Sequence, residues 1–234
     1  MLGLGSSISN NAESIVGFEL TSILGLVMWL KNDTGVVVSQ WDDSSGTGNH
    51  VTQGTAGDQA ALDQGGLNFG EGNDQKFYDF TANIVNSTFT YFFAVEIDTN
   101  NQSQSVFGST VTSNDFIRLN QDADHEFDIK RESGSGPRQR HSHSTDFTTD
   151  AHVFMVRSKA GDLTDFGVDD DIDADVSYGG SSGAVLTLNL LGTQNAGTAN
   201  FVNGTILEVA LYDRVLTDEN VVLVREDIAA RLSL

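Results

Sequence analysis

Short runs of apolar residues recur along most of the chain, and clusters of Gly, Ser, Thr, Asn and Asp separate them at intervals of about 8–12 residues. The runs are rich in Val, Ile, Phe, Tyr and Leu, which favour the pleated, half-buried surface of a β-strand. We expect strands at residues 36–41, 89–97, 116–120, 126–131, 152–158, 185–191 and 206–212. Short strands at this spacing predict an all-β fold of two antiparallel sheets packed as a sandwich.

Strict alternation within residues 126–130 indicates how one of these strands is oriented. Phe127 and Ile129 would point to one face, and Glu126, Asp128 and Lys130 to the other. We therefore expect a strand with one buried face and one face in water.

The C-terminal residues follow a helical period instead. Thr217 is a suitable N-cap, and Asp218 and Glu219 would lie against the positive end of the helix dipole. An apolar stripe at helical spacing follows, formed by Val221, Val224, Ile228 and Leu232. Each of these side chains would stabilise the fold by about 1.5–3 kcal/mol when fully buried. We expect a helix docked on the sandwich.

The first thirty residues or so give a weaker pattern. Residues 1–17 are small and polar with no period, which predicts an N-terminal arm followed by a single domain over residues 18–234. Residues 19–30 fit either a helix or a strand, because Gly25 and the β-branched residues weaken a helix.

Charge and composition narrow the function. The chain has 33 acidic and 12 basic residues and a formal net charge of −21, so nucleic acid is not an expected partner. The absence of cysteine excludes disulfides, zinc–thiolate sites and cysteine nucleophiles. The longest apolar stretch, residues 23–30, is far shorter than the roughly 20 residues of a membrane span. The first residues also lack the basic and apolar regions of a signal peptide, so we expect synthesis in the cytoplasm without one.

Several segments, in order, resemble a known superfamily. The nine residues Trp41-Asp-Asp-Ser-Ser-Gly-Thr-Gly-Asn are similar to a Trp-x-Asp-x-Ser-Gly-x-Gly-Asn signature. Further similar segments are residues 26–31, 65–69 with a Gly-Asn-Asp turn at 72–74, 89–95, 105–110 and 203–219. Together they resemble the laminin-G-like branch of the concanavalin A-like lectin/glucanase superfamily over residues 24–234. The resemblance implies a two-sheet jelly roll in which Trp29 and Trp41 are core residues.

A narrower resemblance concerns the start of the chain. Met1-Leu-Gly-Leu-Gly-Ser ahead of a laminin-G-like domain is similar to virion structural proteins of tailed phages that infect marine cyanobacteria and other marine bacteria. It implies a phage virion protein, either a head (capsid) decoration or a tail or fibre component. The expected partners are other virion proteins, copies of the same chain, or host-surface glycans, and residues 1–17 would be the anchoring arm.

Two other functions compete with this one. The first is a carbohydrate-binding lectin module, with or without Ca²⁺. The second is a glycoside hydrolase, since Glu126, Asp128 and Glu132 imitate the superfamily's catalytic Glu-x-Asp-x-Glu strand. Glu126 and Glu132 would be about 20 Å apart along a strand, whereas retaining carboxyl groups lie about 5–5.5 Å apart. We therefore expect a binding protein and not an enzyme.

Two charged clusters are candidate sites. Asp169, Asp171 and Asp173 alternate in an acidic run, which predicts either a Ca²⁺ site or a solvated acidic hairpin tip. The run stands where the superfamily usually has an Asn-Gly or Asp-Gly hairpin.

The second cluster is basic, and consists of Lys130, Arg131, Arg138 and Arg140. It predicts either a positive surface for an acidic partner or a flexible hairpin with solvated charges. The adjacent His141 and His143 would share one side of an extended segment, but the sequence indicates no third metal ligand.

Overall fold

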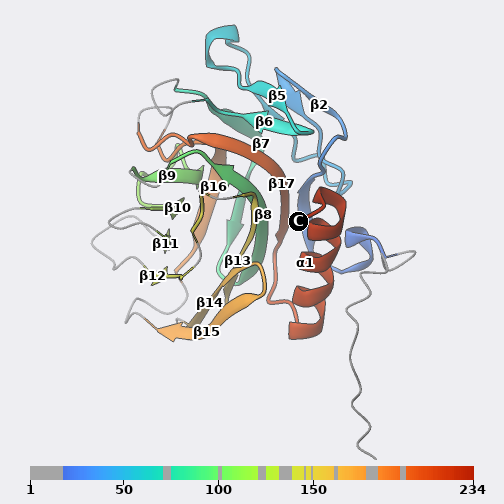
Figure 1. The fold of residues 1–234 in the computed structure, drawn as a ribbon, viewed down its shortest axis with the longest axis vertical. Helices are drawn as coiled ribbons and strands as arrows, with labels where there is room; N and C mark the ends of the chain where they lie inside the picture. The colour runs from blue at the N-terminus through green and yellow to red at the C-terminus, as the bar shows by residue number, and fades with distance from the viewer. Residues whose placement is uncertain are drawn as a thin grey trace, which may run out of the picture.

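Two antiparallel sheets packed face to face form the body of the molecule (Figure 1). The computed structural model describes residues 18–70, 75–99, 102–120, 125–131, 139–144, 146–148, 150–160, 163–177, 184–195 and 199–234. The predicted arm at residues 1–17 and the predicted turn at residues 72–74 lie outside these ranges. The two sheets confirm the all-β jelly-roll sandwich.

Sheet A has eight strands in the order β15-β14-β13-β8-β17-β6-β5, with β1 also paired to β17. Its strands are β1 (Leu26–Leu30), β5 (Ala61–Asp63), β6 (Gly66–Asn68), β8 (Phe89–Ile97), β13 (His152–Ser158), β14 (Leu163–Val168), β15 (Asp171–Ser177) and β17 (Gly204–Tyr212).

Sheet B has nine strands in the order β12-β11-β10-β9-β16-β7-β4-β3-β2. Its strands are β2 (Val36–Val37), β3 (Gln40–Trp41), β4 (Val51–Thr52), β7 (Tyr78–Asn86), β9 (Gln104–Gly108), β10 (Phe116–Leu119), β11 (Glu126–Lys130), β12 (Gln139–Ser142) and β16 (Leu186–Leu191). Three helical segments complete the described elements: the 3₁₀ turns η1 (Leu20–Ser22) and η2 (Ala56–Asp58), and the helix α1 (Asp218–Leu232).

Most predicted strands are observed within one or two residues of their expected bounds, and β8 and β13 match theirs. The single strand expected at residues 36–41 is wrong. It is a tight hairpin in which Val36 pairs with Trp41 across the turn. The ambiguous residues 19–30 divide into the turn η1 and the strand β1.

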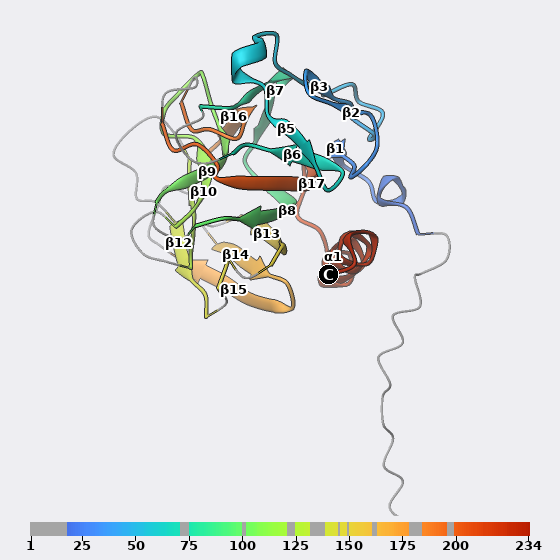
Figure 2. The same cartoon turned by 45° about the horizontal axis from the view of Figure 1, so that its top comes forward.

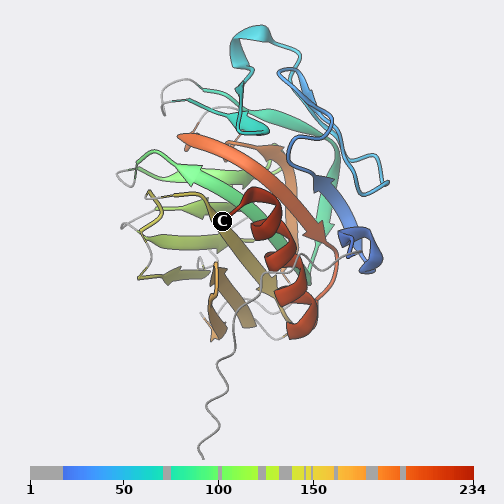
Figure 3. The same cartoon turned by 45° about the vertical axis from the view of Figure 1, so that its right-hand side comes forward.

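The central strands of sheet A, β8, β13 and β17, are buried on both faces. The inner face of sheet A packs on sheet B through an aromatic cluster that includes Phe93, Phe127 and Phe154, with ring centroids 5.3–5.7 Å apart. Its outer face is covered by α1, as Figure 3 shows. This double burial explains why β8 and β17 are continuous apolar runs in the sequence, without polar alternation. Trp41 is buried in the inner core and Trp29 in the layer under the helix, which confirms both as core residues.

The helix begins where the sequence predicts. The Thr217 hydroxyl accepts a hydrogen bond from the Asn220 amide at 3.3 Å, and the predicted stripe is buried through Val221, Val224 and Ile228. Leu232, the fourth residue of the stripe, is partly buried against the same cluster. In the described part of the chain, no helix is long and apolar enough to cross a membrane.

The signature loop after Trp41 is closed by one carboxylate. Asp43 accepts hydrogen bonds at 2.8–3.0 Å from the backbone amides of Trp29, Ser45, Gly48 and Asn49. Burial raises the pKa of Asp43, but these amides and the Ser45 hydroxyl outweigh burial and lower it. The signature residues therefore build a structural loop that ties β1 to the β3–β4 connection.

Candidate functional site

The free edges of the two sheets meet at one side of the sandwich, where β12 ends sheet B and β15 ends sheet A (Figure 2). His141 on β12 stands opposite Phe127, and Asp173 on β15 stands opposite Phe166. Both phenylalanines belong to the inner core, so His141 and Asp173 occupy inward-facing positions at the rim of that core. We call the cluster His141, His143, Asp171 and Asp173 the edge cluster.

Side chains from the two sheets contact each other directly within the edge cluster. His141 Nε2 forms an ion pair with Asp173 Oδ2. The His141 and His143 rings lie edge to face with centroids 4.7 Å apart, and His141 also stacks on Phe166 at 6.2 Å. One ligand atom each from His141, His143 and Asp173 can be chosen so that all three lie within 4.8 Å of one another.

His143 is the most enclosed member of the edge cluster. Its side chain has no exposed surface, and neither ring nitrogen has a hydrogen-bond partner among the described residues. Its Nδ1 lies 3.7 Å from Asp171 Oδ2, beyond hydrogen-bond distance. Burial and the neighbouring His141 lower the pKa of His143, although Asp171 and Asp173 act in the opposite direction. The ring is therefore neutral at neutral pH.

The acidic run divides between two surroundings, and its role as a calcium site stays a prediction. Asp169 lies in the β14–β15 turn, where its Oδ2 is 2.6 Å from His152 Nδ1 and its Oδ1 accepts the Val153 amide at 2.9 Å. Asp171 and Asp173 continue into β15 and face the histidines. Of the three predicted calcium ligands, Asp169 therefore lies in the turn, at the tip of the hairpin. Asp171 and Asp173 lie in the strand that follows it.

A bulge in β15 turns the end of the run away from the edge cluster. The register of β15 against β14 shifts between Asp173 and Val176, and Asp175 has a φ of 56°. Asp175 Oδ1 pairs with Lys159 at 2.9 Å. Asp175 therefore lies outside the edge cluster despite its alternating position in the sequence.

The carboxylates that imitate a hydrolase strand are buried. Glu126 pairs with Arg140 at 2.9 Å, and Asp128, with no exposed surface, lies 3.6 Å from the Arg118 guanidinium. The expectation that this face of β11 is in water is therefore wrong at Glu126 and Asp128, because arginines of the two neighbouring strands neutralise and cover the acids. Glu132 lies outside the described residues.

The basic cluster is engaged with neighbouring parts of the same chain. Lys130 donates to Asn114 at 2.8 Å, and Arg131 donates to Gln139 Oε1 at 2.7 Å. Arg140 carries the ion pair with Glu126 and remains the more exposed partner. Arg138 lies outside the described residues. A role of these four residues in binding an acidic partner stays a prediction.

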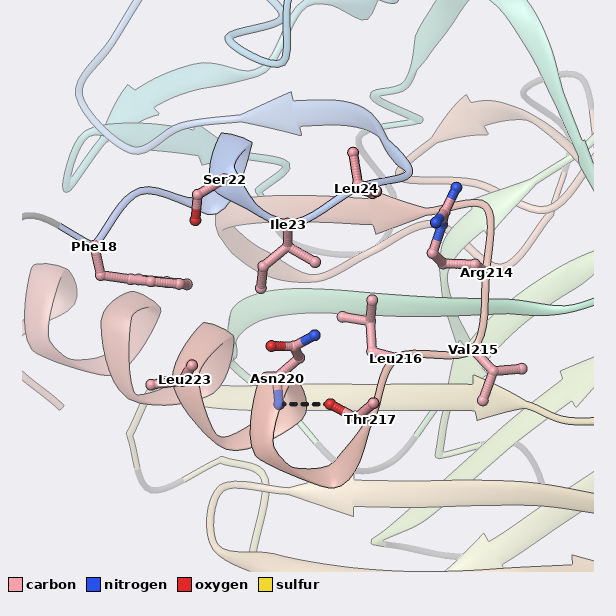
Figure 4. Close-up of a pocket in the computed structure, with 10 residues that line it drawn as sticks. All are labelled: Phe18, Ser22, Ile23, Leu24, Arg214, Val215, Leu216, Thr217, Asn220 and Leu223. Atoms are coloured by element: carbon pink, nitrogen blue, oxygen red, sulfur yellow. Dashed lines mark hydrogen bonds between the residues drawn. The ribbon is translucent and has the colours of Figure 1, made fainter.

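An apolar recess of about 560 Å³ lies beside α1 (Figure 4). Its walls come from η1, from the connection between β17 and α1, and from the first turns of the helix. Its lining residues are Phe18, Ser22, Ile23, Leu24, Arg214, Val215, Leu216, Thr217, Asn220 and Leu223. It has no carboxylate or histidine for acid–base chemistry, so we regard the edge cluster as the candidate functional site.

The sequence indicates the histidine pair and the acidic run separately, but it does not predict that the two segments contact each other. The contact joins strands that are far apart in the sequence and belong to different sheets. The available signal was that both segments alternate polar residues with period two, so each presents two potential ligands on one face.

The two-sheet jelly roll defines the fold class of the protein, and the comparisons with known proteins agree. A family model described as the concanavalin A-like lectin/glucanases superfamily matches residues 69–222. The chain belongs to this superfamily. A search of curated proteins found no match.

Solved structures share the fold at low sequence identity. A Trypanosoma rangeli sialidase in complex with sialic acid matches with a TM-score of 0.59 and 14% identity, over 89% of this chain and 33% of that chain. A mutant of the same sialidase displaying trans-sialidase activity gives a TM-score of 0.59 and 13% identity over the same shares. This chain therefore spans about a third of the sialidases it matches. These likenesses show the fold alone.

Proposed function

We propose that the chain is a non-catalytic structural protein of a phage virion, a head decoration or a tail or fibre component that acts by binding. Its superfamily is named for both lectins and glucanases, so the fold does not fix the function. The observation that carries the proposal is the burial of Glu126 and Asp128 in ion pairs with arginines.

Those ion pairs are incompatible with glycoside hydrolysis at β11. A hydrolase of this kind needs one carboxyl group that can donate a proton and a second that attacks the sugar or activates water. Each acid is instead held by an arginine of a neighbouring strand, Glu126 by Arg140 and Asp128 by Arg118. Burial also keeps a polysaccharide from reaching either group. These acids stabilise the sheet and do not catalyse.

The distribution of aromatic residues favours contacts with other virion proteins over sugar stacking. Sugar rings commonly stack their apolar faces on exposed aromatic side chains. Among the described residues no aromatic side chain is exposed, and Trp29, Trp41, Tyr78, Tyr91 and Tyr212 are all buried. A lattice of virion proteins needs no such platform.

The alternative is a carbohydrate-binding module. It is supported by the name of the superfamily and by the fold shared with a sialidase solved with sialic acid. In this case the isolated monomer would bind a surface glycan through polar side chains.

Two assays on the isolated protein separate these functions. We expect no cleavage of a polysaccharide panel and no change on Glu126→Gln. Turnover that Glu126→Gln abolishes would contradict the non-catalytic assignment. We also expect no binding on a glycan array with or without Ca²⁺. Saturable binding by the monomer would favour the carbohydrate-binding module.

The predicted anchoring arm gives a further assay. We expect a chain lacking residues 1–17 to fold but not to assemble on particles. Failure of that shortened chain to fold would show that these residues belong to the core.

A further inference from the structure

We propose that His141, His143 and Asp173 bind one divalent transition-metal ion of the zinc type, which clamps the free edges of the two sheets together. His141 and His143 come from the edge of sheet B and Asp173 from the edge of sheet A. An ion shared by these residues would therefore cross-link the two sheets at an edge where they meet through side chains.

The geometry of the three residues suits a shared ion. Ligands arranged tetrahedrally around zinc at about 2.0–2.2 Å lie about 3.4 Å from one another. One ligand atom each from His141, His143 and Asp173 already lies within 4.8 Å of the other two. Small side-chain rotations would complete the site.

The buried ring of His143, whose nitrogens have no hydrogen-bond partner among the described residues, is independent support for a bound ion. A buried polar group without a hydrogen bond is costly and rare in native proteins. Both nitrogens of this fully buried ring lack a hydrogen-bond partner among the described residues. The ring packs edge to face on His141, whose Nε2 contacts Asp173 Oδ2, so the other two potential ligands are its neighbours. A bound ion would satisfy it.

The donor set selects the kind of metal. Imidazole nitrogens suit zinc, copper, nickel and iron, whereas Ca²⁺ takes six to eight oxygens. Two imidazoles and one carboxylate therefore favour a transition metal over the calcium ion that the acidic run alone suggests.

Asp171 is placed to orient His143 rather than to bind the ion. Its Oδ2 is 3.7 Å from His143 Nδ1, so a small side-chain rotation would bring the two within hydrogen-bond distance and would leave Nε2 for the ion. Metal-binding histidines usually donate their second N–H to a carboxylate, and loss of that carboxylate typically weakens metal binding about 10–100-fold. Asp171 is a positioning residue, so its removal should cost less than removal of Asp173.

The alternative explanation is that the edge cluster binds no ion and only prevents the sheets of different molecules from pairing edge to edge. Inward-pointing charges on edge strands discourage pairing between sheets of different molecules, and they need no ion. The two explanations differ in metal affinity, which decides between them.

The test is titration of the full chain, stripped with a chelator, with Zn²⁺ by calorimetry and with Co²⁺ by its visible absorption. We expect one ion per chain, tetrahedral-type Co²⁺ bands, and a rise in Tm of about 5–10 °C at a hundredfold excess of Zn²⁺ over Kd. Ca²⁺ in excess should not compete.

Variants locate the site. The Asp173→Asn variant should fold, because the Asp173 side chain is about half exposed. His141→Gln is a second variant, which removes another of the proposed ligands. Each should weaken Zn²⁺ binding more than about 100-fold, and Asp171→Asn about 10–100-fold. His50→Gln is the matched control, because His50 lies outside the edge cluster beside Asp42, and it should bind as the unchanged chain does. No binding of Zn²⁺ or Co²⁺ by the unchanged chain, or binding that survives Asp173→Asn and His141→Gln, would overturn the proposal.

Discussion

Arg231 in the last turn of α1 places its Nη2 2.9 Å from Oε1 of Glu208, a carboxylate of β17 with no exposed surface. The same Glu208 oxygen accepts the Trp29 indole N–H at 2.8 Å. Burial of a carboxylate is tolerated only when it is paired and hydrogen-bonded. This pair therefore fixes the end of the helix to the outer face of sheet A.

Loss of the arginine from this pair should be strongly destabilising. Arg231→Ala leaves the Glu208 charge buried without its cation, so we expect the free energy of unfolding to fall by about 3–5 kcal/mol. Urea denaturation followed by fluorescence measures the change. Arg214→Ala is the control, because Arg214 and its partner Asp213 are both about half exposed, and it should cost less than about 1 kcal/mol. Equal effects of the two changes would show that the buried pair has no special role.

Asp43 should stabilise the signature loop because its carboxylate accepts hydrogen bonds from four backbone amides. Asp43→Ala leaves four backbone amides without their acceptor, so we expect a loss of about 1–3 kcal/mol. Asp42→Ala, on the neighbouring half-exposed residue, should have little effect. Comparable losses from the two changes would contradict the assigned role of Asp43.

The same carboxylate gives a pH dependence. Hydrogen bonds outweigh burial and hold the pKa of Asp43 below its ordinary value of 3.8 in the folded chain. Its contribution is therefore complete above that value and is lost as the pH falls through the lower, folded pKa. We expect the unchanged chain to lose more stability than Asp43→Asn as the pH falls below about 4, measured by denaturation across acidic buffers. Parallel curves for the two proteins would exclude the shift.

For His152 we expect a pH dependence of stability opposite in direction to that of Asp43. Its hydrogen bond to Asp169 raises its pKa above the ordinary 6.5, although burial opposes the shift. The contribution to stability is complete below 6.5 and is lost as the pH rises through the higher, folded pKa. His152→Gln should therefore lose more stability at about pH 5 than at about pH 9, measured with a chelator present. A loss independent of pH would show that folding does not shift the pKa of His152.

Much of the fold could be predicted from local patterns. The run Phe89–Ile97 and the stripe through Val221, Val224 and Ile228 specify their elements because apolar periodicity follows directly from burial. The hairpin at Val36 was mistaken for one strand, since its turn at residues 38–39 has no Gly, Pro, Asn or Asp to mark it.

The polar positions could not be predicted in the same way. Glu126 and Asp128 alternate with apolar residues as solvated side chains would, and only the pairing of β11 with Arg118 of β10 and Arg140 of β12 buries them. Asp173 reaches the histidines through contact between the edges of different sheets. Such contacts depend on tertiary structure. The period-two pattern of each segment shows which of its side chains share a face, but not which other strand they meet.

The most direct test of the proposed virion role is cryo-electron microscopy of purified particles from the source of the chain. The assignment predicts density for this jelly roll at fixed, symmetry-related positions on the head, tail or fibres. Particles that are complete and lack the chain would contradict it.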